Sequence, residues 1–174
     1  EIPRHNEVSN QNRITASTTL NHKFNARHSI RTGIIANRIG FNVNQQIYDQ
    51  DVDAVKLTID DNGNTYTFQV YAQSRYYLTP DFSLNTGLHY YHLAYNNTYS
   101  LEPRAALKYE IDNRQSVSLG YGLHSQLQPV GTYFAQQPDG SLPNESLSFS
   151  KSNHFVAGYD RMVTESLRIK AETY

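Results

Sequence analysis

The sequence predicts an all-β protein, an antiparallel up-and-down β-barrel of the transmembrane class, from three observations. Apolar and polar residues alternate with a period of two through most of the 174 residues. Short and long links alternate between the segments with this pattern, and aromatic residues gather beside the short links. Strands of outer-membrane barrels are organised in this way because they face lipid on one side and a polar lumen on the other.

Eight segments carry the alternation. In the first, Ile14 and Leu20 fall on one face of a strand, whereas Arg13 and Lys23 fall on the other. The predicted strands cover residues 13–24, 29–44, 65–78, 82–95, 101–111, 116–127, 153–163 and 167–174. The apolar sides, which are expected to face lipid, include Leu20, Val70, Leu107 and Leu119. The polar sides include Thr19, Gln69 and Ser118.

The links between these strands are of two kinds. Four are tight and polar, with three or four residues each, at 25–28, 79–81, 112–115 and 164–166. The others are longer and irregular, at 45–64, 96–100 and 129–153. Outer-membrane barrels have short periplasmic turns and longer extracellular loops. We therefore expect the short links to lie in the periplasm, and segments 49–64 and 129–152 to lie outside the cell.

The first long segment contains a hairpin signal. Asn62 and Gly63 lie between two apolar runs, 55–59 and 66–68. The dipeptide Asn-Gly accommodates the positive φ angles of a tight hairpin turn. The sequence therefore predicts a hairpin that turns at 61–64 and stands above the membrane.

Aromatic residues lie on the apolar face, within about one to five residues of a short link. This is the depth at which amphipathic rings sit between acyl chains and headgroups. Strands favour Tyr and Phe in any case, so a soluble sandwich is the alternative interpretation. The predicted aromatic belt consists of Phe24, Tyr76, Phe82, Tyr109 and Tyr159.

Composition excludes several classes of protein. The hydrophobic content of 38% and mean hydropathy of −0.65 are too polar for helical membrane spans. The net charge of −1 and the scattered basic residues give no indication of a nucleic-acid partner. No nucleophile, base and acid occur at a recognisable spacing, so an enzyme is not expected. Gly120 and Gly122 fall within a predicted strand, where glycine marks a bend or a close backbone approach.

Two groups of residues could bind a metal. Asp49, Asp51 and Asp53 alternate in an outer loop, where carboxylates can gather around calcium, although the Gly and Glu of an EF-hand are missing. A solvated acidic loop is the alternative. His89 and His92 are three residues apart, so on a strand they face opposite sides and could not easily share one zinc ion.

Three runs resemble the barrel of TonB-dependent receptors from the Bacteroidetes: LEPR at 101–104, GYGLHSQLQP at 120–129 and FSKSNHFVAGYD at 149–160. The resemblance is clearest from residue 101 onward. It implies a barrel of 22 strands filled by an N-terminal plug, with a TonB box that an inner-membrane motor pulls. Neither the plug nor the TonB box matches any part of this sequence. Because the last strand is open-ended, residues 1–174 are expected to form an interior part of one such barrel domain.

The resemblance implies import of a chelated metal, glycan or peptide across the bacterial outer membrane. The implied partners are outer-membrane lipid, the plug and a TonB-type energy-coupling protein, with a surface lipoprotein as a further candidate. No cofactor beyond calcium is expected. The candidate ligand contacts near the strand tops are Tyr91, Tyr95, His124 and Gln126. The candidate lumen-lining residues are Arg75, Glu102, Arg104, Lys108 and Glu110.

The mixed charges of the lumen-lining set have two interpretations. They form either a wall that contacts plug or solute, or a water-filled lumen in which the charges compensate one another. Two other classes of protein also remain. One is a small complete eight-stranded outer-membrane barrel with a structural or adhesive role. The other is a soluble lipocalin-like barrel, which would turn its apolar residues inward around a ligand.

Overall fold

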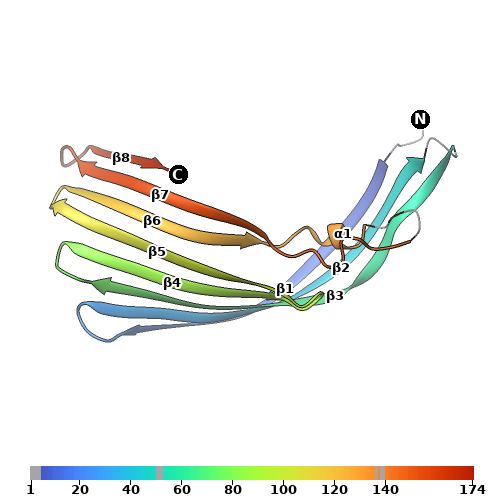
Figure 1. Ribbon diagram of the computed structural model, residues 1–174, viewed down its shortest axis with the longest axis horizontal. Coiled ribbons are helices and arrows are strands. Elements are labelled where there is room, and N and C mark those ends of the chain that lie inside the picture. The colour runs from blue at the N-terminus through green and yellow to red at the C-terminus, as the bar shows by residue number, and fades with distance from the viewer. Residues whose placement is uncertain (1–4, 50–52, 136, 138–139) are drawn as a thin grey trace.

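The computed structural model describes residues 5–49, 53–135, 137 and 140–174. These residues form one curved antiparallel sheet of eight strands in chain order (Figure 1). The strands are β1 (His5–Lys23), β2 (His28–Asp49), β3 (Ala54–Tyr77), β4 (Phe82–Leu93), β5 (Thr98–Asp112), β6 (Gln115–Gln126), β7 (Ser150–Met162) and β8 (Arg168–Thr173). One short helix, α1 (Val130–Tyr133), lies between β6 and β7.

This architecture confirms the predicted all-β, up-and-down antiparallel class. Each strand pairs with the next in sequence, and the four short links lie together at one end of the sheet (Figure 1). Among the described residues β1 pairs with β2 alone and β8 with β7 alone, so the sheet is open. None of the described helices is long and apolar enough to cross a membrane.

The prediction for residues 45–64 was wrong. This segment was expected to be an irregular link with a turn at Asn62 and Gly63, but β2 continues to Asp49 and β3 already begins at Ala54. Gly63 instead pairs with Phe41, and a Cβ atom on it would lie 3.2 Å from the Phe41 ring. The Asn-Gly turn does not form because extended β2 supplies a pairing partner for the whole segment.

The corrected hairpin is longer than expected. Strand β4 pairs with β3 only over Thr67–Tyr77, so the paired ends of β1, β2 and β3 extend beyond β4 (Figure 1). The β4–β5 link at 94–97 is also tighter than the expected 96–100. Asn97 has a φ of 57°, and Asn96 Oδ1 accepts hydrogen bonds from the amide and hydroxyl of Thr98.

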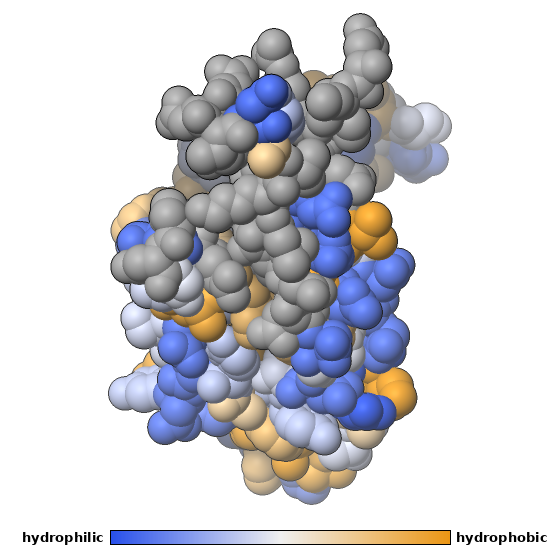
Figure 2. All heavy atoms as spheres, turned by 90° about the vertical axis from the view of Figure 1, so that its right-hand side faces the viewer, coloured by the Kyte–Doolittle hydropathy of each residue, from blue (hydrophilic) through white to orange (hydrophobic). Residues whose placement is uncertain are grey.

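The sheet has two chemically different faces. The inner face carries the odd-numbered residues of β1–β4 and the even-numbered residues of β5–β8, and its buried polar residues include Thr67, Ser100 and Glu102. The outer face carries apolar residues that remain open, such as Leu20 at 66% exposure and Phe155 at 68%. Figure 2 shows hydrophobic side chains reaching the surface of the molecule. Many exposed apolar side chains on one face mark a surface that a membrane or another protein covers.

Aromatic residues form two bands on the outer face. Near the short links, the ring of Phe82 lies 6.1 Å from that of Tyr109. Farther along the same strands, the ring of Tyr90 lies 5.9 Å from that of Tyr99. On β3 the bands are ten residues apart, from Tyr66 to Tyr76, which is about 33 Å along the strand. If the strand tilts by about 40° from the barrel axis, this length corresponds to about 25 Å along the axis, which is the height of the apolar band of an outer-membrane barrel.

Arginine substitutions should separate the two faces. We expect Leu20→Arg to lower the free energy of unfolding by about 2–4 kcal/mol, because it places a charge in lipid. Ser17→Arg, on the exposed inner face of the same strand, should cost far less. Refolding titrations of the complete protein into lipid vesicles would measure both values. Equal costs would show that the outer face does not meet lipid.

Candidate functional site

A hydrogen-bonded row of polar side chains crosses the inner face. Thr15 Oγ1 donates to Asn37 Oδ1 at 2.7 Å, and Asn37 Nδ2 donates to Thr67 Oγ1 at 2.9 Å. These three residues are direct cross-strand partners on β1, β2 and β3. Asn37 and Thr67 are buried, so pairing their polar groups avoids a desolvation penalty. The row fixes the side chains of three strands without apolar packing.

Glu102 is the centre of a second polar network. Its side chain is only 5% exposed, and Oε2 accepts hydrogen bonds from His89 Nδ1 at 2.9 Å and from Arg104 Nη2 at 3.3 Å. Its Oε1 accepts a hydrogen bond from the hydroxyl of Ser125. His89 Nε2 lies 3.1 Å from Gln69 Oε1. A carboxylate held by three partners positions side chains from β4, β5 and β6.

The long β6–β7 link (127–149) folds over the inner face at the end away from the short links (Figure 1). Phe134 stacks on Phe41 with 4.8 Å between ring centroids. Asn96 Nδ2 donates to the carbonyl oxygens of Glu145 and Leu147 at 3.0 and 2.8 Å. This contact area, the apolar cap, consists of Ile39, Phe41, Val43, Leu93, Val130, Tyr133, Phe134 and Phe149.

Two predicted ligand contacts pack against this cap. The ring of Tyr91 lies 4.7 Å from that of Phe149, and the ring of Tyr95 lies 5.6 Å from that of Tyr133. Burial in the cap raises the pKa of the Tyr133 phenol above its ordinary value. The two tyrosines therefore anchor the long link, and a contact of either with a solute stays a prediction.

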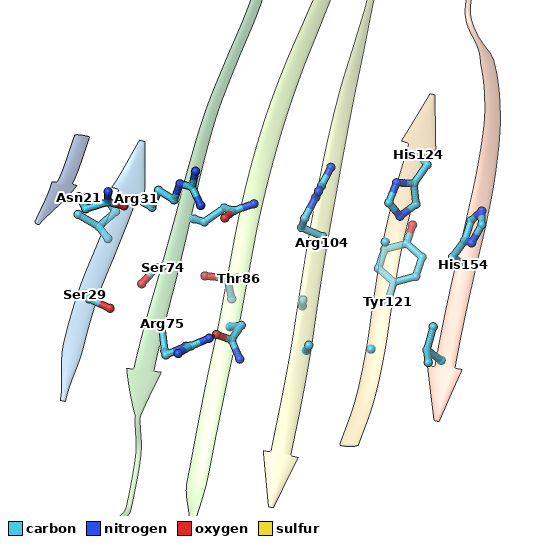
Figure 3. Close-up of a pocket in the computed structure, with 18 of the residues that line it drawn as sticks. Asn21, Ser29, Arg31, Ser74, Arg75, Thr86, Arg104, Tyr121, His124 and His154 are labelled. Carbon is cyan, nitrogen blue, oxygen red and sulfur yellow. The ribbon is translucent and has the colours of Figure 1, made fainter. Parts of the chain in front are cut away.

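Between the cap and the short links, the inner face is hollowed. This inner hollow has a volume of about 710 Å³. Figure 3 shows Arg31, Arg75 and Arg104 projecting from β2, β3 and β5 around it. Room for Arg104 comes from its cross-strand partner Gly87, where a Cβ atom would lie 2.9 Å from Arg104 Cγ. No Asp or Glu occurs among the described residues that line the inner hollow.

A histidine pair borders the inner hollow. The ring centroids of His124 and His154 are 4.8 Å apart, in an edge-to-face arrangement. Strand pairing places Gly122 opposite His154, and a Cβ atom on Gly122 would lie 2.9 Å from His124 Nε2. Gly122 is thus approached closely by a side chain, and not by backbone as expected for a strand glycine. Sequence analysis missed the histidine pair because only the β6–β7 register joins residues 30 positions apart.

The remaining predicted residues lie on the expected face. Arg75 and Arg104 line the inner hollow, and Glu102 lies beside Arg104. Lys108 and Glu110 form their own ion pair at 2.6 Å, outside the hollow. Similar pairs join Lys170 to Glu172 and Arg168 to Asp160 on β7 and β8. Gln126 is exposed at the end of β6. Charges on β5–β8 therefore compensate one another locally.

The candidate metal ligands are only partly described. Asp51 and the side chain of Asp49 lie outside the described residues, and Asp53 accepts a hydrogen bond from the Tyr48 hydroxyl. Calcium binding by this loop stays a prediction. His89 contacts Glu102 on the inner face, whereas His92 contacts Asn97 and lies among outer-face aromatic rings. Within the described part of the chain, no three His, Asp or Glu side chains form a metal-binding group.

Comparisons with known proteins bear on the fold. No protein-family model and no curated protein matches the sequence. Among solved structures, the copper transporter OprC is similar over 95% of this chain, with a TM-score of 0.65 and 13% sequence identity. The chain spans about 30% of the length of that structure. The eight-stranded sheet thus has the fold of part of a transmembrane β-barrel, as predicted, although it is not itself closed.

The Glu102 network should matter for stability. We expect Glu102→Ala to lower the free energy of unfolding by about 1–3 kcal/mol, because it leaves the hydrogen-bonding groups of His89 and Ser125 without their partner. Glu110→Ala is the matched control. It removes an exposed pair from the same strand and face, so it should cost under about 1 kcal/mol. Urea titrations of the refolded complete protein would measure both free energies of unfolding. A larger decrease for Glu110→Ala than for Glu102→Ala would contradict the assignment of Glu102 as the centre of the network.

Proposed function

We propose that this chain forms part of the barrel of an outer-membrane, TonB-dependent transporter of the Bacteroidetes type, which binds and imports a solute. The observation that carries the proposal is the chemical difference between the two faces of the sheet. An open apolar face lies between two aromatic bands, whereas the other face is polar, hydrogen-bonded and hollowed. A sheet of this kind separates lipid from a water-filled lumen. The barrel fold supports the same arrangement.

The alternatives fit the geometry less well. A lipocalin-like barrel turns its apolar side chains inward, whereas here the inward apolar side chains gather mainly in the apolar cap and many large ones, such as Leu20 and Phe155, are exposed on the outer face. A complete eight-stranded barrel would pair its first and last strands, and the described residues of β1 and β8 make no such pairing. The chain resembles a structure named as a transporter rather than an enzyme, and the proposal assigns it no catalytic role.

In the proposed transporter, outer-membrane lipid covers the outer face. A plug domain and a TonB-type protein of the inner membrane supply gating and energy, and a surface lipoprotein is a further candidate partner. The apolar cap lies at the extracellular mouth, so a solute enters past Tyr91 and Tyr95 before it meets His124 and the inner hollow. Chelated metals, glycans and peptides are the solute classes to test.

The orientation can be tested with single cysteines in a cysteine-free background of the complete protein. In whole cells, a membrane-impermeant thiol reagent should label cysteines at positions Asn62 and Ser141, which lie at the long-link end, but not one at Asn113 in a short link. Labelling at Asn113 alone would show that the barrel is inverted. Labelling at all three positions would contradict a membrane-spanning sheet.

Energy coupling tests the transport role itself. Cells that depend on the complete protein for growth on one solute from the three proposed classes should lose that growth when the TonB-type protein is deleted. Uptake of the radiolabelled solute should fall to the background of cells without the receptor. Uptake that persists after the deletion would show that this is a passive barrel instead.

A further inference from the structure

Positive charge is concentrated at the inner hollow. Lys23, Arg31, Arg75 and Arg104 line it, and no Asp or Glu occurs among the described lining residues. On β5–β8, by contrast, acidic and basic side chains alternate and form ion pairs with one another. The inner face therefore carries poorly compensated cations at the inner hollow and paired charges on β5–β8 outside it.

The strand register aligns the cations in two neighbouring rows. One row crosses the sheet through Asn21, Arg31, Gln73, Gly87, Arg104 and Gly122. The next row runs through Lys23, Ser29, Arg75, Asn85 and Ala106. Between β2 and β5, Arg31 and Arg104 are three strand spacings apart, about 14 Å. The small residues Gly87, Ala106 and Gly122 leave open space beside the longer cationic side chains.

These cations are poorly neutralised by the protein. Arg104 makes one contact at 3.3 Å with Glu102, a carboxylate already shared with His89 and Ser125. Arg75 donates to the neutral Asn85 at 3.0 Å. Within the described residues, Lys23 and Arg31 form no ion pair with an acidic side chain. Uncompensated charges of one sign in a recess create a potential that concentrates counter-ions.

We propose that the inner hollow is a binding site for a small anionic solute that carries carboxylate or phosphate groups. The guanidinium groups of Arg31 and Arg75 can each bind such a group through two parallel hydrogen bonds. A hollow of about 710 Å³ has the size of a small-molecule site. Charge complementarity and volume together favour a small anion. The inference rests on the proposed function, because it takes the inner face as part of a barrel wall that a solute reaches.

Citrate and inorganic phosphate are the probes, and titration calorimetry on the complete protein in detergent at low ionic strength is the measurement. We expect one or both to bind. Arg31→Gln and Arg75→Gln should each weaken binding about tenfold or more, because each removes a charge-assisted contact. Lys170→Gln, which removes an inner-face charge outside the hollow, is the matched control and should change the affinity less than about twofold.

Several outcomes would overturn the proposal. If neither citrate nor phosphate binds, the proposal is wrong. In that case, a higher thermal stability of Arg31→Gln or Arg75→Gln would show that the cations repel one another. A lower thermal stability of these variants would show that carboxylates of another protein segment occupy the inner hollow. If Lys170→Gln weakens binding as much as the two arginine variants do, the anion is attracted by charge in general and not by the inner hollow. A protein that labels with the expected topology but binds neither probe overturns this inference alone, whereas one that fails to enter the membrane overturns the proposed function as well.

Discussion

The two-residue period of a paired strand is the constraint on which this structure depends. Because the side chains alternate between faces, the pairing of β1 with β2 at Leu20 and Thr32 commits every other residue of both strands to a surface. Within the described residues, no second layer covers the outer face. Most of its stability must therefore come from backbone pairing, polar rows such as Thr15–Asn37–Thr67 and the apolar environment that the outer face requires. A one-residue shift in register would turn Leu20 toward the hollow and Lys23 toward lipid.

The same period explains which features could be predicted from sequence. The order of the eight strands, the four short links and the residues of the apolar face follow from local alternation and agree with the structure, although β1, β2 and β3 are longer than predicted. Contact of the apolar face with lipid stays a prediction. The predicted turn at Asn62 and Gly63 does not form, because a local preference of about 1 kcal/mol competes with many hydrogen bonds to an extended partner strand. Contacts such as His124 with His154 could not be predicted, because they depend on a register that joins strands across the whole 127–149 link.

Glycine has a specific role on the inner face. At Gly33 a Cβ atom would lie 2.5 Å from the Tyr71 ring, and at Gly87 it would lie 2.9 Å from Arg104 Cγ. Direct cross-strand partners are close enough that a bulky residue can lie flat only over a neighbour without a side chain. Tyr71 and Arg104 therefore extend along the sheet, and Tyr71 Oη lies 2.9 Å from Thr19 Oγ1. These pairs position polar groups close to the sheet surface, which neither alternation nor composition could indicate.

The inner face combines two environments of different chemistry. At the end away from the short links, the apolar cap packs Phe134 and Phe149 against Phe41 and Leu93, so the described part of the long link is held against the sheet. Toward the short links, Arg31, Arg75 and Arg104 surround the inner hollow. The cap offers ring contacts, whereas the hollow offers charge-assisted hydrogen bonds, which strengthen where water is scarce and weaken with salt.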